Sequence, residues 1–423
     1  MIFLFLSVGS IIVFLEYRKQ RNVINPISLL MIPYLLLVFF NNTIAHRIGF
    51  YKVDDKILIM YSLSFIFYYI GTILASLNTK KLDLNEEDNK FRFLNYKINL
   101  MTNILLGIGL ISLIKLLYLI KKFSFSEFEG MMGNGMTGHL MLLSYSLSPI
   151  VFLYWLYNKK KLKCLVAIVL ILITTFSTFI KYNVIGFIIN IFIFISLYKK
   201  SILKKAITIL IFLVLFLFCF NYIIGFYLSN LSAPSEFYFR HFLVYIFGST
   251  INANHIFLEG INTHLTLFYK IMIFIFALPN MFFNKIIGRT FFPWSIATYD
   301  FYPISNNESS NVIDAIGYLY PSYGNEIEII IFYIFMIVVG FIFYKIYINS
   351  IKKLHVFNTL ISNFMTYFIF LSFFGTFYML SSPWEILIYS MFIPKLFLKK
   401  KFRKERGKNY GKNTIFNLEK RNR

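Results

Sequence analysis

Long apolar runs separated by short basic clusters are the feature that most limits how this chain can fold. Hydrophobic residues make up 58% of the 423 residues and charged residues 14%, whereas a soluble domain has about 45–50% apolar and about 25% charged residues. An apolar run of about 17–25 residues crosses the hydrocarbon core of a bilayer as a helix. The pattern therefore predicts an all-α polytopic membrane protein.

The apolar runs predict about eleven transmembrane helices. One long polar stretch, residues 229–326, separates the eighth span from the ninth, and we call it the outer segment. The sixth and seventh spans nearly meet, so we expect a tight helical hairpin there with Lys181 at its tip. The expected spans are 1–16, 26–45, 57–77, 99–120, 139–157, 163–180, 182–198, 203–228, 327–348, 356–380 and 384–398.

The basic clusters set the predicted orientation, because Lys and Arg concentrate in the cytoplasmic loops of membrane proteins. The clusters fall on one face of the predicted bundle, and the outer segment falls on the other. This places the N-terminus outside and the C-terminus in the cytoplasm. The net charge of +23 then reflects membrane topology rather than nucleic-acid binding. No basic residue precedes the first apolar run, so we expect a retained span rather than a cleaved signal peptide.

The same pattern divides the chain into consecutive parts. Eight spans in 1–228 precede the outer segment, three spans in 327–398 follow it, and a basic cytoplasmic tail in 399–423 is predicted to bind anionic lipid headgroups. The outer segment contains two apolar stretches, near 242–247 and 265–283. We expect interfacial or re-entrant helices there, because one added span would invert the topology after it. A true span at 265–283 is the alternative.

The outer segment also concentrates reactive side chains. Its arginines, Arg240 and Arg289, suit phosphate oxygens because a guanidinium binds them bidentately, although either could instead reach lipid headgroups. Lys181 is a third candidate cation, since an ammonium near hydrocarbon needs a polar partner. Each carboxylate or histidine alone fits a solvated loop residue, but together they are candidate general bases: Glu236, His241, His255, Glu259, His264, Asp300 and Asp314.

Two charged residues lie inside or beside other spans. Lys115, within the fourth span, is expected to face a cavity or a partner rather than lipid. Glu385, after Pro383 and Trp384, is expected to cap the last helix at its N-terminus. Phosphate-binding glycine loops and His/Cys metal-ligand spacings are absent from the sequence, so it predicts no metal and no cofactor.

The stretch Asn311–Gly324, which leads into the apolar run from Ile327, resembles the end of the large external loop of O-antigen polymerases. These are the Wzy-type oligosaccharide repeat-unit polymerases. Asn25-Pro26 before the second span, residues 238–252 and the overall layout of spans share the resemblance. Two positions depart from the family pattern: Lys181 stands where members have arginine, and Ser322-Tyr323-Gly324 lacks their acidic residue.

The resemblance implies a GT-C-like polymerase/ligase fold in the bacterial plasma (inner) membrane. It implies transfer of a growing glycan from an undecaprenyl-diphosphate carrier to the next lipid-linked repeat unit of O-antigen or capsule, with membrane lipids and a chain-length regulator protein as partners and no nucleic acid. The implied roles are as follows: Arg240, Arg289 and Lys181 bind diphosphate; His241, Asp314 or Glu236 acts as base; Asn311, Tyr320 and Tyr323 contact the glycan.

Two other functions stay open at this stage. An O-antigen ligase has a similar fold and the same donor, and His255 and His264 fit its histidine-bearing outer loop. A polysaccharide flippase or other transporter would have about a dozen or more spans, short loops and cations lining the bundle. The single long outer segment and the few intramembrane charges speak against a transporter.

Overall fold

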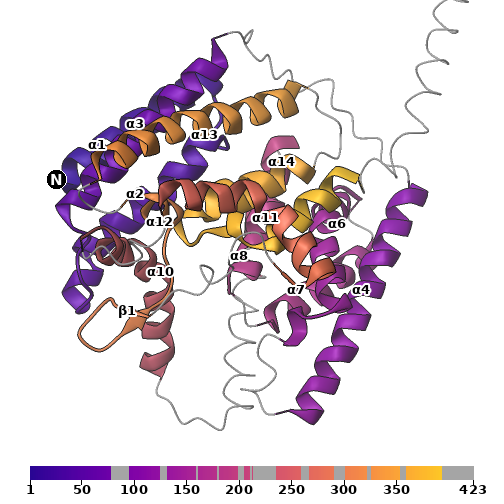
Figure 1. The fold of residues 1–423 in the computed structure, drawn as a ribbon. Coiled ribbons are helices and arrows are strands. Elements are labelled where there is room, and N and C mark those ends of the chain that lie inside the picture. Colours follow the sequence, from indigo (N-terminus) through magenta and orange to yellow (C-terminus); the bar gives the residue numbers. More distant parts are fainter. Residues whose placement is uncertain are drawn as a thin grey trace, which may run out of the picture.

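The computed structural model describes residues 1–77, 95–123, 131–158, 161–178, 181–198, 204–209, 212, 235–258, 266–289, 301–321, 325–352 and 359–392. Helices make up most of these residues, with one short two-stranded hairpin (Figure 1). The predicted all-α class is confirmed for this part of the chain. Most of the expected eighth span and the whole basic tail lie outside the described residues.

Within the described ranges, five helices are long and apolar enough to cross a membrane. They are α2 (Pro26–Thr43), α3 (Asp55–Ser76), α4 (Asn95–Lys122), α6 (Met136–Asn158) and α13 (Glu326–Lys352). All five coincide with expected spans. The protein is therefore compatible with a membrane-embedded helical bundle, while the number of spans and their orientation stay predictions.

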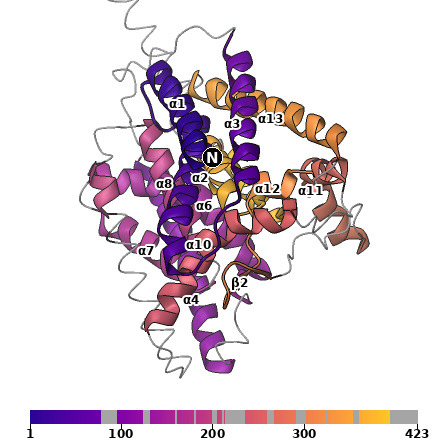
Figure 2. The ribbon, with the colours of Figure 1, turned by 90° about the vertical axis from the view of Figure 1, so that its left-hand side faces the viewer.

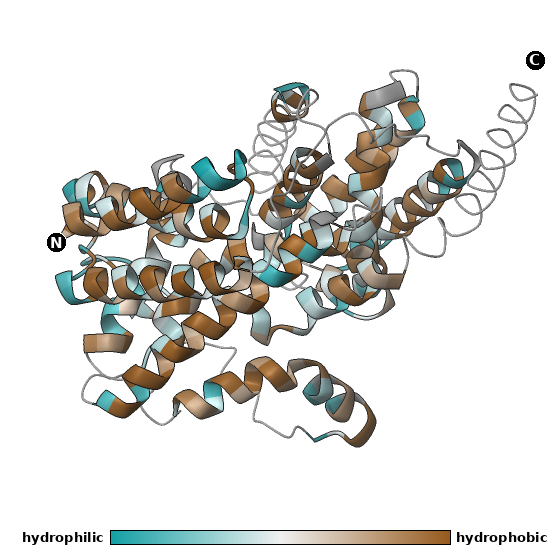
Figure 3. Cartoon of the chain, turned by 90° about the horizontal axis from the view of Figure 1, so that it is seen from above, coloured by the Kyte–Doolittle hydropathy of each residue, from teal (hydrophilic) through white to brown (hydrophobic). Residues whose placement is uncertain are grey.

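Three further helices match expected spans but are shorter or more polar. These are α1 (Ile2–Gln20), α7 (Leu162–Phe176) and α8 (Lys181–Tyr198). The helix α1 extends past the expected end of the first span and so includes Glu16 and Lys19. Large apolar side chains remain exposed on several helices, for example Ile114 on α4 and Ile330 on α13. In Figure 3, hydrophobic residues occupy much of the helices, as expected for helices that cross a bilayer.

The expected tenth span, 356–380, is not one continuous helix. Its described part consists of α14 (Thr359–Phe364), a π-helical turn (η5, Met365–Ile369) and a 3₁₀ turn (η6, Phe370–Phe373), followed by a separate 3₁₀ turn (η7, Phe377–Met379). The Ser372 carbonyl, near the break, accepts a hydrogen bond from the Tyr34 hydroxyl of α2 at 3.0 Å. A side chain from another helix thus supplies a partner where the helical ladder ends, which helix periodicity could not predict.

The helices form two neighbouring groups. In one group, α1 packs on α2 and α3, and α3 packs along α13 (Figures 1 and 2). In the other, α4 packs on α6 and α7, and α8 packs on α6 and α7. The broken helix α14–η5 lies between them, since it contacts α2 and α13 on one side and α6 and α8 on the other.

The outer segment is folded onto the first group rather than extended as a loop. It contains α10 (Ser235–Leu258), α11 (Leu267–Ile287), the hairpin of β1 (Tyr302–Pro303) with β2 (Ser309–Ser310), and the short helix α12 (Ala315–Leu319). The helix α10 contacts α2, α3 and α12, while α11 contacts α12 and η7. Both apolar stretches of the segment are therefore helical, and their position relative to a bilayer stays a prediction.

Two glycines bring the backbones of α3 and α13 into direct contact. A Cβ atom added at Gly71 would clash with the carbonyl oxygen of Ile337, and one added at Gly340 would clash with that of Tyr68. Neither carbonyl belongs to a flexible side chain, so the helices would have to move apart. Close approach through small residues is a common way for membrane helices to pack.

We expect Gly340→Ala to destabilise the folded protein by about 1–3 kcal/mol, because the new methyl group overpacks this crossing. The measurement is thermal unfolding of the detergent-purified protein by intrinsic fluorescence. Gly107→Ala is the matched control, since a Cβ at Gly107 on α4 meets no atom within 4 Å. Equal melting of Gly340→Ala and the wild type would contradict the close crossing.

Candidate functional site

A fully buried carboxylate, Asp314, connects the outer segment to two long helices. It caps α12, accepting a hydrogen bond from the Gly317 amide at 2.8 Å. One oxygen, Oδ1, also lies 3.0 Å from the Tyr34 hydroxyl of α2, and Oδ2 accepts from the Tyr61 hydroxyl of α3 at 2.6 Å. Both carboxylate oxygens are therefore engaged, and three elements meet at this residue.

Neighbouring residues hold the backbone around Asp314 against α10. The Asn252 side chain of α10 donates to the Ser310 carbonyl at 2.7 Å and to the Val312 carbonyl at 2.9 Å. A Cβ added at Gly317 would lie 2.8 Å from both the Ala253 methyl group and an Asp314 oxygen. Glycine thus lets α12 lie against α10 while its amide reaches the carboxylate.

The hydroxyl of Tyr34 contacts two acceptors with only one proton. Its oxygen lies 3.0 Å from Asp314 Oδ1 and 3.0 Å from the Ser372 carbonyl oxygen. Tyr34 donates to both of these acceptors, so its single proton is shared between them. Asp314 lies outside the expected spans, and burial raises the pKa of its carboxyl to about 6. Burial therefore favours the protonated form of this carboxyl more strongly than water does.

These contacts give Asp314 a positioning role in the structure. Its side chain is 0% exposed, and both oxygens face protein donors. The sequence-based hypothesis that Asp314 is a general base stays a prediction. A substrate hydroxyl would reach it only after Tyr34 or Tyr61 had moved.

The other two proposed bases lie on one helix. Glu236 and His241 belong to the first part of α10, but their side chains are outside the described part of the chain. His255, near the end of α10, donates through Nε2 to the Pro303 carbonyl at 2.8 Å, and its ring stacks on Tyr302 at 5.7 Å. His255 therefore attaches the hairpin to α10. The remaining candidates, Glu259, His264 and Asp300, lie outside the described residues.

Arg240, predicted to bind diphosphate, is paired with a carboxylate. Its Nε and Nη2 atoms donate to the two oxygens of Glu308, and the guanidinium lies 5.6 Å from the centre of the Phe50 ring. Ser305 donates a further hydrogen bond to Glu308. The hydrogen bond from Arg240 holds the pKa of Glu308 below its usual value. An incoming phosphate would have to compete with Glu308 for this guanidinium.

The other predicted phosphate ligands are placed differently. Arg289 is exposed, one residue beyond the Gly288 cap of α11, and forms no ion pair with any carboxylate among the described residues. Lys181 begins α8, but its side chain is outside the described part. The structure does not bring Arg240, Arg289 and Lys181 into one described cluster.

The proposed glycan ligands divide in the same way. Tyr320 is buried, packing on Phe257 and Phe332 at 5.1 and 5.0 Å between ring centres, with its hydroxyl 3.5 Å from that of Tyr333. This environment is a protein interior rather than a sugar-stacking surface. Asn311 is half-buried, and Tyr323 lies outside the described residues.

A buried cation of the outer segment, Lys270, was not among the predicted site residues. It lies on α11 with 3% exposure and donates to the carbonyls of Tyr318 at 2.7 Å and Tyr320 at 3.2 Å. Its ammonium therefore binds the C-terminal carbonyls of α12 and completes the attachment of that helix. The one sequence signal was a lysine interrupting an apolar run.

An apolar pocket lies beside α12. Its cavity volume is about 60 Å³. Residues from α2, α3, α11, α12, α13 and the broken helix line it, among them Leu30, Tyr68, Phe274, Ile316, Phe335 and Phe368. The lining is almost entirely apolar, so the pocket suits a hydrocarbon chain better than a sugar.

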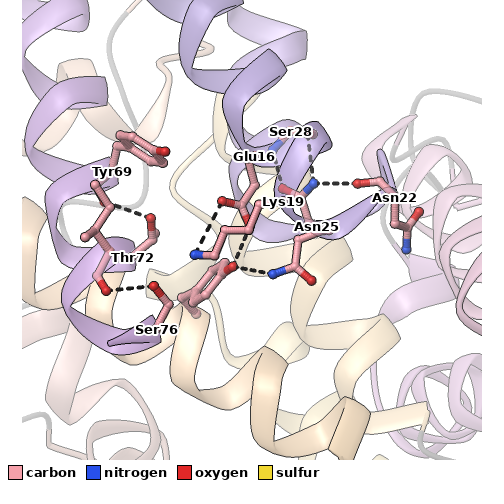
Figure 4. A network of polar contacts seen from close by, with 11 residues as sticks. Glu16, Lys19, Asn22, Asn25, Ser28, Tyr69, Thr72 and Ser76 are labelled. Carbon is pink, nitrogen blue, oxygen red and sulfur yellow. Dashed lines mark hydrogen bonds and ion pairs between the residues drawn. The ribbon is translucent and has the colours of Figure 1, made fainter. Parts of the chain in front are cut away.

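A second polar cluster surrounds Glu16 near the C-terminal end of α1 (Figure 4). Glu16 is fully buried, accepts a hydrogen bond from the Tyr344 hydroxyl of α13 and lies 4.0 Å from the Lys19 ammonium. Close by, the Asn25 side chain caps α2 by accepting from the Ser28 amide at 2.9 Å. Asn25-Pro26 thus has a structural explanation, since Asn at the N-cap and Pro at the first helical position favour helix initiation.

Comparisons of the chain with known protein families, with curated proteins and with solved structures found no match. The fold and the helix composition define the class as an all-helical protein suited to a membrane.

The pKa of Asp314 leads to a testable pH dependence. Burial raises the pKa of the folded Asp314 carboxyl from 3.8 to about 6, so folding favours the protonated form. This contribution to stability is complete below about pH 4 and is lost as the pH rises through about 6. We expect the melting temperature of the wild type, relative to that of Asp314→Asn, to fall between about pH 4 and pH 6 and to change little above that range.

Asp314→Ala is expected to be destabilising at every pH, since it leaves buried donors unsatisfied at about 1–3 kcal/mol each. Thermal unfolding of the purified proteins at a series of pH values measures both effects. A difference between wild type and Asp314→Asn that does not change with pH would rule out the buried titration.

Proposed function

We propose that the protein polymerises lipid-linked oligosaccharide repeat units into surface polysaccharide, O-antigen or capsule, at the outer face of a bacterial plasma membrane. The observation that carries this proposal is an apolar-lined pocket beside α12, next to the folded outer segment. A substrate with a hydrocarbon tail and a polar sugar head matches this arrangement. The resemblance of Asn311–Gly324 to the polymerases adds the reaction.

The proposed reaction exchanges one bond to an anomeric carbon for another. A hydroxyl oxygen of the acceptor repeat unit attacks the anomeric carbon of the donor glycan and loses its proton to a base. The bond to the diphosphate oxygen breaks, and undecaprenyl diphosphate leaves with the electron pair. Cationic side chains stabilise the leaving charge electrostatically, without a covalent intermediate.

The two arginines differ in how available they are to bind a diphosphate. Arg289 is exposed and lies at the end of α11, whereas the Arg240 guanidinium is already bound to Glu308. A new anion at Arg289 displaces no described carboxylate. Arg289 is therefore the stronger candidate of the two.

Deleting the gene in its host tests the proposed function. We expect the surface glycan to run on a gel as a single repeat unit in place of a ladder, because polymerisation stops while synthesis of the unit continues. Complementation with the wild-type gene restores the ladder. An unchanged ladder would contradict the proposal, and complete loss of surface glycan would favour a ligase or a flippase instead.

We expect Arg289→Ala to shorten the glycan chains with the amount of membrane protein unchanged, since loss of one stabilising cation lowers the transfer rate by about 10²–10³-fold. The measurement is the ladder profile of the complemented deletion strain, with the protein quantified by immunoblot. Arg47→Ala is the matched control, because Arg47 is another exposed arginine on the predicted outer side.

Arg240→Ala breaks the ion pair with Glu308, so its effect combines binding and stability, with the partly exposed pair worth about 0.2–1 kcal/mol. A ladder of normal length in the Arg289→Ala strain would exclude Arg289 as the diphosphate ligand.

A further inference from the structure

A histidine and a carboxylate that are far apart in the sequence form a dyad outside the outer segment. The Nδ1 atom of His139, in the first turn of α6, lies 2.6 Å from Oε1 of Glu385. The Tyr389 hydroxyl donates to the same oxygen at 2.5 Å, one helical turn beyond Glu385. The last described helix spans 381–392, so Glu385 lies past its first turn and binds side chains rather than capping the helix. This corrects the sequence-based expectation.

The dyad fixes which nitrogen of His139 carries the proton. A carboxylate next to Nδ1 accepts the Nδ1 proton, so the neutral ring presents an unprotonated Nε2. The His139 side chain is 44% exposed, while the Glu385 side chain is only 12% exposed. The ring is therefore anchored on its buried side and accessible on the other. This is the arrangement that a general base requires.

The backbone that carries His139 is held by a lysine from another helix. The Lys115 ammonium of α4 donates to the Asn134 carbonyl at 2.9 Å and to the Thr137 hydroxyl at 2.6 Å. A Cβ added at Gly138 would clash with the Gly133 carbonyl, so the turn before α6 is tightly packed. These contacts confirm that Lys115 faces a partner, and they limit the movement of His139.

The dyad adjoins the residues of the apolar pocket. Trp384 precedes Glu385 in the chain, and its ring lies 5.9 Å from Phe274 and 4.8 Å from Phe368, which both line the pocket. The Trp384 indole also donates to the carbonyl of Tyr378, another lining residue, at 2.7 Å. Trp384 thus connects the pocket lining to the residue next to Glu385 in the chain, and the dyad lies on the predicted outer side.

We propose that His139, oriented by Glu385, is the general base that accepts the proton from the acceptor sugar hydroxyl. This proposal rests on the proposed function. The hydroxyl oxygen forms its bond to the anomeric carbon while its proton passes to Nε2 of His139, and the leaving diphosphate takes the electron pair of the broken bond. Glu385 is a positioning residue that stabilises the resulting imidazolium.

The other described histidines and carboxylates fit this role less well. The His255 Nε2 atom already donates to the Pro303 carbonyl, and the exposed His46 is bonded through Nδ1 to the Phe50 carbonyl rather than to a carboxylate. Asp314 is fully buried with both oxygens engaged. Among the described residues His139 alone combines an exposed ring with a carboxylate partner.

The test uses the complemented deletion strain and a membrane assay. The assay substrate is the undecaprenyl-diphosphate-linked repeat unit extracted from the deletion strain. We expect His139→Ala to lower the transfer rate by about 10²–10⁴-fold, the usual contribution of a general base, and added imidazole to restore part of it. His46→Ala is the matched control and should retain the wild-type rate.

Glu385→Gln separates positioning from a purely structural role. We expect it to lower kcat while KM for the acceptor stays unchanged and the protein level in the membrane stays normal. A normal ladder in the His139→Ala strain, when gene deletion abolishes the ladder, would overturn the dyad while leaving the proposed function intact. Loss of activity that imidazole does not restore, with a raised KM, would also overturn it. If deletion itself leaves the ladder unchanged, the proposed function fails and this proposal fails with it.

Discussion

The position of the outer segment depends on one buried carboxylate. Asp314 is the contact point of α2, α3 and α12, because its two oxygens meet Tyr34, Tyr61 and the Gly317 amide. A buried carboxylate is stable only when its oxygens have hydrogen-bond donors. The donors come from α2, α3 and α12, so these three elements must stay together around Asp314. Lys270 adds a second link by binding the other end of α12. The short helix is therefore fixed at both ends, and one wall of the pocket is fixed with it.

The long helices could be predicted from the sequence because the apolar runs that specify them are local. Pro26–Thr43, Asp55–Ser76 and Glu326–Lys352 coincide closely with expected spans. The break in the tenth span was missed, and the Ser372 carbonyl near it is bonded to a hydroxyl from α2 instead of to its own helix. Hydropathy describes the solvent that a segment prefers, and it carries no information about which distant side chain replaces a backbone hydrogen bond.

The candidate site was predicted less completely, because its contacts join residues that are far apart in the sequence. Asp314 was identified, but its partners lie 280 and 253 residues away in the sequence. The pair of His139 and Glu385 is separated by 246 residues, and the sequence analysis did not identify His139 as a candidate. The hypothesis that one loop gathers the polar chemistry stays a prediction, to which the structure adds the pair of His139 and Glu385. The described reactive groups come from α4, α6, the last helix and the outer segment together.

Electrostatics limits where a diphosphate could bind among these groups. Arg240 is neutralised by Glu308, and Lys270 is enclosed by the carbonyls of α12. Arg289 is exposed, yet it follows the C-terminal end of α11, where the helix dipole places about half a negative charge. That dipole favours the arginine but opposes a phosphate beside it. A diphosphate bound at Arg289 would therefore need a second cation. Arg240 could serve as that cation if phosphate replaced Glu308, but the existing bidentate pair would then be lost.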